Sequence, residues 1–156
     1  MKKLLILLLL SLVAWAKPGW RNFAPDGESF LCEFPTTSKV SDSKTAESSY
    51  WLALEKGKYV LQVGYADGVV TATNTEECIQ GMLKGLSIRE TRRSTRRQGK
   101  LTVIDLIGVV GKGGGNDPFH MLVFPKTDRI YFVNTVTFKG APQATAEHFL
   151  TSFQLK

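Results

Sequence analysis

Alternating apolar and polar positions predict several β-strands in this chain. Phe30, Cys32 and Phe34 share one face of a strand over residues 30–34, and Pro35 ends it. Two later pairs of apolar runs are each separated by a short polar turn, a pattern typical of β-hairpins. The strands predicted for these hairpins are residues 50–54 with 59–66 and residues 118–125 with 129–138.

Residues 101–110 are apolar on both faces of the strand that they predict. One face carries Leu101, Val103, Ile107 and Val109, and the other carries Ile104, Leu106 and Val110. Strands with two apolar faces are typical of positions that are covered on both sides. We therefore expect this strand to lie in the middle of a sheet.

Two segments have the spacing of amphipathic helices. The first is expected to begin at Thr75, which suits an N-cap, and to end near Leu86, with Glu76 and Glu77 in its first turn. The second covers residues 141–152. Residues 36–49 are rich in Ser, Thr and Lys and predict a surface loop.

This order of elements predicts an α+β fold, in which an antiparallel sheet carries helices packed on its faces. The chain has 156 residues, of which 43% are apolar. This length and this apolar content suit one domain over residues 17–156.

The first residues have the three parts of a secretory signal peptide. Lys2 and Lys3 precede an apolar run from Leu4 to Val13, and small residues at Ala14 and Ala16 suit cleavage after position 16. The run is shorter than the roughly 20 residues of a membrane span. We therefore expect residues 1–16 to be removed, and the mature protein to be exported, soluble and not membrane-spanning.

Positive charge is concentrated in one segment. The chain has 20 Lys and Arg against 14 Asp and Glu, and its net charge without Lys2 and Lys3 is about +4. Residues 89–100 alone carry about +5, so the rest of the mature chain is nearly neutral. This distribution does not indicate general affinity for nucleic acid, which is not an expected partner.

The basic segment predicts a strand followed by a turn at Gln98 and Gly99. Strict alternation would place Arg89, Arg93 and Arg97 on one face and Arg92 and Arg96 on the other. Guanidinium groups suit planar contacts with carboxylates and phosphates, so the segment predicts docking of an acidic protein or an anionic surface of the cell envelope. The alternative is a solvated edge strand whose charges prevent aggregation. The candidate residues are Arg89, Arg92, Arg93, Arg96, Arg97 and Lys100.

The chain has two cysteines, which form either one disulfide or two free thiols. Cys32 lies on the apolar face of the first predicted strand, and Cys78 lies on the apolar side of the first predicted helix. In an oxidising compartment the two thiols can form a disulfide, and otherwise they are two buried free thiols.

Signals for catalysis, cofactors or metals are missing from the sequence. Gly108 to Gly115 resembles a phosphate-binding loop, but Lys112 is followed by Gly113 instead of Ser or Thr. His120 and His148 have no partner at metal-ligand spacing. We therefore predict no cofactor, no metal and no enzymatic activity.

Aromatic residues and Pro-Gly positions along the chain give it a resemblance to a known family. Trp20, Phe23, Pro25 and Gly27, the segment FLCEFP at 30–35 and the segment AEHFLTSFQL at 146–155 resemble the exported PsbP-like domains of bacteria. That family is related in fold to the PsbP subunit of photosystem II and to the Mog family of Ran-binding import factors. The resemblance covers roughly residues 20–155 and implies an α/β/α sandwich with a binding or assembly role. No catalytic residue is implied.

The sequence therefore predicts an exported binding or assembly module in the periplasm or outside the cell. A small hydrolase with a scattered site and a carrier of anions or lipids are the alternatives. Converging acid and base groups in a polar cleft would favour the hydrolase. An apolar pocket between sheet and helix would favour the carrier, and a closed core would favour the binding module.

Overall fold

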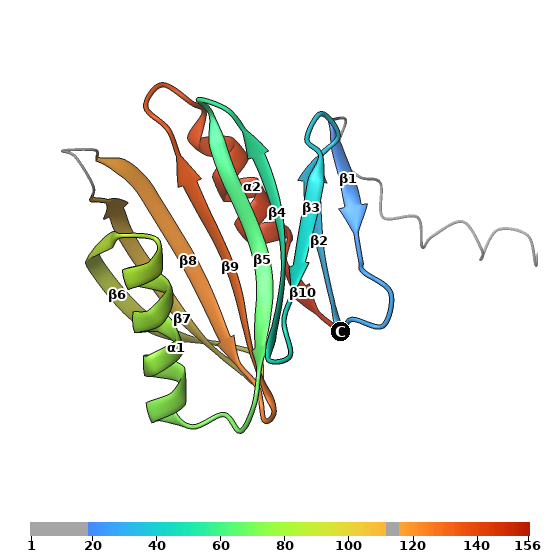
Figure 1. Ribbon diagram of the computed structural model, residues 1–156, viewed down its shortest axis with the longest axis vertical. Helices are drawn as coiled ribbons and strands as arrows, with labels where there is room; N and C mark the ends of the chain where they lie inside the picture. The colour runs from blue at the N-terminus through green and yellow to red at the C-terminus, as the bar shows by residue number, and fades with distance from the viewer. Residues whose placement is uncertain (1–18, 112–115) are drawn as a thin grey trace, which may run out of the picture.

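A computed structural model describes residues 19–111 and 116–156 (Figure 1). The predicted signal peptide and Lys112 to Gly115 of the glycine-rich loop lie outside these residues. The elements are β1 (Trp20–Phe23), β2 (Phe30–Pro35), β3 (Val40–Lys44), β4 (Ser48–Glu55), β5 (Tyr59–Asp67), α1 (Ala72–Gly85), β6 (Ile88–Gln98), β7 (Leu101–Val110), β8 (Asp117–Pro125), β9 (Arg129–Thr137), α2 (Gln143–Ser152) and β10 (Gln154–Leu155).

Seven strands form an antiparallel sheet in the order β3-β4-β5-β9-β8-β7-β6. Both predicted hairpins are present, since β4 pairs with β5 and β8 pairs with β9. A second, three-stranded sheet has the order β1-β2-β10. In it β1 and β10 run antiparallel to β2.

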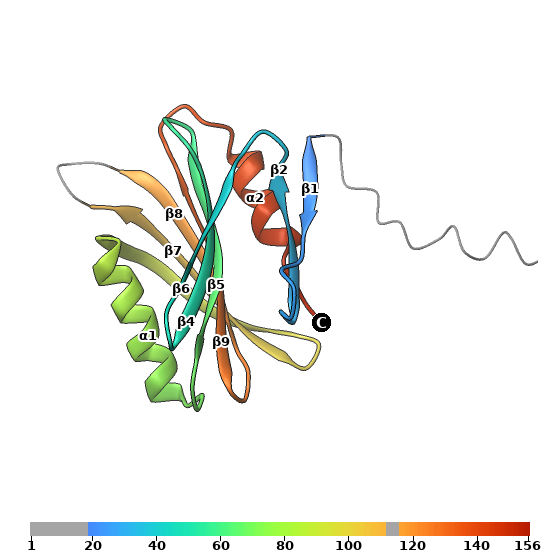
Figure 2. The ribbon, with the colours of Figure 1, turned by 45° about the vertical axis from the view of Figure 1, so that its right-hand side comes forward.

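The large sheet is covered on its two faces by different elements (Figure 2). Helix α1 lies on one face, which we call the α1 face. Helix α2 and the small sheet lie over the other face. The α+β fold with helices on both faces of an antiparallel sheet is thereby confirmed.

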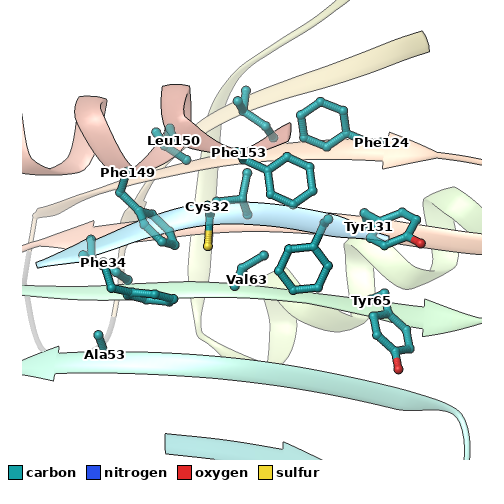
Figure 3. Packing of buried hydrophobic residues seen from close by; sticks show 14 of the residues in the cluster. Cys32, Phe34, Ala53, Val63, Tyr65, Phe124, Tyr131, Phe149, Leu150 and Phe153 are labelled. Atoms are coloured by element: carbon teal, nitrogen blue, oxygen red, sulfur yellow. The ribbon is translucent and has the colours of Figure 1, made fainter. Parts of the chain in front are cut away.

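The core beneath α2 is largely aromatic (Figure 3). Phe30, Phe34 and Phe149 are fully buried between the small sheet, α2 and the large sheet. The rings of Phe34 and Phe149 lie with centroids 5.0 Å apart, and those of Phe124 and Phe153 are 4.9 Å apart. Aromatic side chains of this size fill much of the space between the layers.

Helix α1 packs through the residues that its periodicity places on one side. Thr75, Ile79 and Leu83 are buried, and Ile79 and Leu83 join the core on the α1 face. The helix begins four residues earlier than predicted, because Thr71 is the N-cap and accepts a hydrogen bond from the Asn74 amide. The Thr75 hydroxyl instead donates to the Thr71 carbonyl inside the helix.

Arg129 joins the loop before β2 to the large sheet. Its guanidinium pairs with Glu28 at 2.9 Å and with Asp67 at 2.7 Å. It also lies 3.7 Å from the ring centroid of Tyr65, and the Tyr65 hydroxyl donates to Glu28. One arginine therefore connects three segments of the chain.

Several predicted boundaries were wrong where the strands are short or polar. Residues 36–49 contain β3, which has few apolar side chains but pairs with β4 along its length. Residues 20–23 form β1 and residues 154–155 form β10, neither of which was predicted as a strand. The last helix begins at Gln143, after Pro142 as N-cap.

Strand β7 has the two predicted faces but not the predicted place in the sheet. It is second from the edge, next to β6. Each face has one fully buried large side chain, Leu106 on the α1 face and Val103 on the other. The remaining apolar residues of both faces are half-buried, namely Ile104 and Val110 on the α1 face and Leu101, Ile107 and Val109 on the other. On the face opposite α1, α2 packs against β2, β5 and β9 and does not extend over this end of the sheet.

Candidate functional site

The predicted basic strand is β6, which lies at one edge of the large sheet. Arg89, Arg92 and Arg96 are exposed along it. Their cross-strand neighbours on β7 are Val109, Ile107 and Val103, in the same order. Because directly opposed residues of a pair share a face, all three arginines lie on the face opposite α1. We call Arg89, Arg92 and Arg96 the basic face.

This grouping corrects the faces predicted by strict alternation. The register between β6 and β7 shifts between Glu90 and Arg92, as a β-bulge does, and Thr91 is left without a β7 partner. One extra residue inverts the alternation after it. Arg89 therefore joins Arg92 and Arg96, while Arg93 and Arg97 lie on the α1 face.

Gly108 accommodates the β6 backbone beside the bulge. A Cβ atom at this position would lie 2.7 Å from the Arg89 carbonyl oxygen and 2.8 Å from Cγ2 of Ile88. Only glycine allows the two backbones to approach so closely without displacement. The glycine of β7 thus belongs to the structure that aligns the basic face.

Arg93 is a structural residue in spite of its place in the basic segment. Its Nε and Nη2 atoms donate to Glu90 at 2.9 and 2.7 Å, and its Nη1 atom donates to Glu76 of α1. The hydrogen bonds to Glu90 raise the pKa of the guanidinium, and the hydrogen bond from Arg93 lowers the pKa of Glu76. Arg93 therefore fixes β6 to α1, and its charge is neutralised.

The other two candidate cations lie away from the basic face. Arg97 is opposite Thr102 on the α1 face, and Lys100 is exposed in the turn after Gly99, whose φ is 61°. In the part of the chain that the structure describes, no ion pair involves the basic face, Arg97 or Lys100. Five cations of the segment are thus available to a partner.

His120 and Asp105 add a polar pair to the same side of the sheet. The His120 Nε2 and Asp105 Oδ1 atoms are 2.9 Å apart, and both side chains are partly exposed. Ile107, which pairs with Arg92, also pairs with His120 on β8. The basic face therefore adjoins half-buried apolar side chains and one paired carboxylate.

A second histidine pair lies between α2 and the small sheet. His148 binds Glu33 of β2, and the indole of Trp20 lies 4.0 Å from the imidazole ring, centroid to centroid. The pair lines a cavity of about 490 Å³. The adjacent Ser152 hydroxyl donates to the Phe149 carbonyl and accepts from the Glu33 amide, so it holds the layers together and is not free as a nucleophile.

Neither histidine pair extends to a metal site. Among residues 19–111 and 116–156, no group of three His, Cys, Asp or Glu side chains is arranged to hold a metal ion. The two pairs were missed from the sequence because their members are 15 and 115 residues apart. Only the fold brings them together.

The structure has two free thiols and not the disulfide. Cys32 is fully buried in the core beneath α2 (Figure 3), whereas Cys78 packs against the core on the α1 face. The large sheet lies between these cores, so the two sulfur atoms cannot meet in this fold. Burial raises the pKa of both thiols, which disfavours the reactive thiolate.

Comparison with known proteins places the fold. No protein-family model matches the chain, and no curated protein matches its sequence. The solution structure of cyanobacterial PsbP (CyanoP) from Synechocystis sp. PCC 6803 is similar, with a TM-score of 0.68 and 11% identity over 92% of this chain and 96% of that chain. A crystal structure from Bacteroides thetaiotaomicron VPI-5482 has a TM-score of 0.55 and 14% identity over 88% of this chain, which covers 49% of that protein. The fold is therefore PsbP-like, as the resemblance implied.

Helices long and apolar enough to cross a membrane are absent from the described residues.

Proposed function

We propose that this protein is a non-catalytic binding module that docks an anionic partner through the basic face. The observation that carries the proposal is the alignment of Arg89, Arg92 and Arg96 on one open side of the sheet, without an acidic partner among the described residues. Three guanidinium groups on one face repel one another in the free protein. An anionic partner relieves that repulsion and can accept two hydrogen bonds from each group.

The surroundings of the basic face favour docking over a purely protective edge. Charged side chains that only prevent another strand from pairing with an edge can do so from either face of the edge strand, so they need not share one face. Here the bulge brings three of them to the side where Ile107 and Val109 are half-buried. A partner held by the arginines would also cover these two side chains and gain the free energy of their burial.

The carrier and hydrolase alternatives have weaker support. The cavity between the start of α1 and β6 has a volume of about 470 Å³, and its lining combines four apolar residues with four threonines and the charged Glu76–Arg93 pair. Such a lining does not suit a lipid chain. The His148–Glu33 pair could supply a base, but the neighbouring Ser152 hydroxyl is engaged in holding the layers together.

We also propose that the module acts after export, because residues 1–16 have the pattern of a signal peptide. Protein isolated from the periplasm or the medium is expected to begin at Lys17. N-terminal sequencing measures this directly, and an intact Met1 on the mature protein would contradict export by this route.

Replacing the basic face is expected to weaken binding to a polyanion about tenfold or more, because each arginine contributes a charge-assisted contact. The variant is Arg89→Gln, Arg92→Gln and Arg96→Gln, and the measurement is a heparin binding titration at low and moderate salt. Wild-type binding should fall with salt, since exposed charges are screened.

The matched control is Lys39→Gln, Lys44→Gln and Lys56→Gln, which removes the same charge from exposed lysines far along the sheet from β6. It should bind heparin nearly as well as the wild type. Equal losses in the two triple variants would mean that only net charge matters, and the proposal would then be abandoned.

A further inference from the structure

The outer edge of β6 is long and open. The strand has 11 residues, is the last in the sheet, and is exposed at every position from Ser94 to Gln98. In the part of the chain that the structure describes, no strand pairs with this edge. The opposite edge of the sheet is β3, which has only five residues. Short edge strands are one protection against unwanted pairing, and β6 lacks it.

From this edge we infer that the partner is an acidic polypeptide segment that pairs with β6 as an additional strand. The inference rests on the proposed function and specifies the partner. An edge strand presents a row of N–H and C=O groups that an extended peptide can pair with. The backbone would supply affinity, and the arginines would select an acidic sequence.

The spacing of the arginines defines the sequence that fits. Arg92 and Arg96 lie on the basic face four residues apart, with Ser94 between them. Opposed side chains of paired strands have Cβ atoms about 4.5–5.5 Å apart. A paired segment would therefore place acidic residues four positions apart against Arg92 and Arg96. Arg97 follows Arg96 on β6 but lies on the α1 face. In the paired segment, the residue that lies against Arg97 is therefore the neighbour of the one that lies against Arg96, and an acidic residue would also suit that position.

The same charges exclude other occupants of this edge. A second copy of β6 would place arginines opposite arginines, and directly opposed like charges destabilise a strand pair. A membrane surface would meet the arginines but would leave the backbone groups of the edge unpaired. Among residues 19–111 and 116–156, the exposed large apolar side chains that a bilayer could receive are Leu54, Val69 and Leu86, and none lies in β6. An acidic polypeptide satisfies both the charges and the backbone.

The experiment uses three peptides of about ten residues that alternate glutamate and threonine. One has an ordinary backbone, one is N-methylated at every glutamate, and one is N-methylated at every threonine. The amides of an added strand point alternately toward and away from its neighbour. One N-methylated peptide is therefore expected to bind the wild-type protein at least tenfold more weakly than the ordinary peptide, and the other should bind nearly as well.

Hydrogen exchange supplies an independent reading of the same contact. The ordinary peptide is expected to slow exchange of alternate amides between Arg92 and Gln98, because those amides become hydrogen bonded. The Arg89→Gln, Arg92→Gln and Arg96→Gln variant should lose this protection, and the lysine control variant should keep it.

Each other outcome is decisive. Equal binding of all three peptides, lost in the arginine variant, would overturn strand pairing and leave the proposed function in place. Binding to vesicles of phosphatidylglycerol without binding to any peptide would overturn the inference in favour of a lipid surface. Identical behaviour of the arginine variant and the wild type toward heparin and every peptide would overturn the proposed function as well.

Discussion

Replacing Phe149 with alanine is expected to lower the free energy of unfolding by about 3–5 kcal/mol, the range measured for large aromatic residues in closed cores. Phe149 extends from α2 into the space between the small sheet and the large sheet (Figure 3), where it is fully buried. Its ring packs at 5.0 Å from that of Phe34. Alanine would leave a cavity that two sheets and a helix cannot all close. Urea denaturation with an unchanged slope measures the loss.

Two control variants separate packing from other effects. Phe149→Leu keeps most of the volume and should lose roughly half as much stability as Phe149→Ala. Glu147→Ala changes an exposed position of the same helix and should stay within about 0.5 kcal/mol of the wild type. A loss below about 1 kcal/mol for Phe149→Ala would contradict the packing of α2 described above.

Replacing Arg129 with methionine is expected to lower the free energy of unfolding by about 2–3 kcal/mol. Removing one member of a buried ion pair leaves the other charge without compensation, which typically costs about 3–5 kcal/mol. The Glu28 side chain is only 13% exposed, but that of Asp67 is 44% exposed, so solvent screens part of the effect. The lost contact with the Tyr65 ring adds to the penalty.

Arg129→Lys keeps the charge but cannot reproduce the planar contacts with both carboxylates and the ring, so about half of the loss should remain. Arg97→Gln removes an exposed arginine without an ion pair and should change stability by less than about 0.5 kcal/mol. Thermal denaturation of the three variants at one salt concentration gives the comparison. Equal stability of Arg129→Met and Arg97→Gln would show that the Arg129 contacts do not hold the loop.

Except for β6, which was predicted as a strand although it has no buried residue, the strands predicted correctly are those with a buried face. The segments of β8 and β9 are nearly continuous apolar runs, because alternate side chains pack under α1 and under α2. In β2 the fully buried residues Phe30, Cys32 and Phe34 instead alternate with less buried ones. In these segments the buried positions carry apolar residues, which can be recognised in the sequence. Strands β1, β3 and β10 are short or polar, and each packs only one or two partly buried apolar side chains against the core, which leaves little pattern in the chain.

The candidate site was predicted as a segment but not as a surface. Composition alone locates the cations of residues 89–100. Their faces depend on a bulge that arises where β6 passes close to Gly108, and nothing in the spacing of the arginines indicates it. Arg93 looks like its neighbours in the sequence, yet its partner Glu76 comes from α1. Both the faces of the arginines and the structural role of Arg93 therefore depend on contacts between segments that are distant in the sequence.

The pairing of β10 with β2 determines when the small sheet can form. The Glu33 amide donates to the Ser152 hydroxyl, 119 residues later in the chain, and Leu31 pairs with Gln154. At ribosomal rates of about 5–20 residues per second, the ribosome needs on the order of ten seconds to make the intervening chain. Until then Phe30 and Phe34 have neither α2 nor β10 to cover them. The small sheet is thus completed by residues made long after its central strand, and its folding follows synthesis instead of accompanying it.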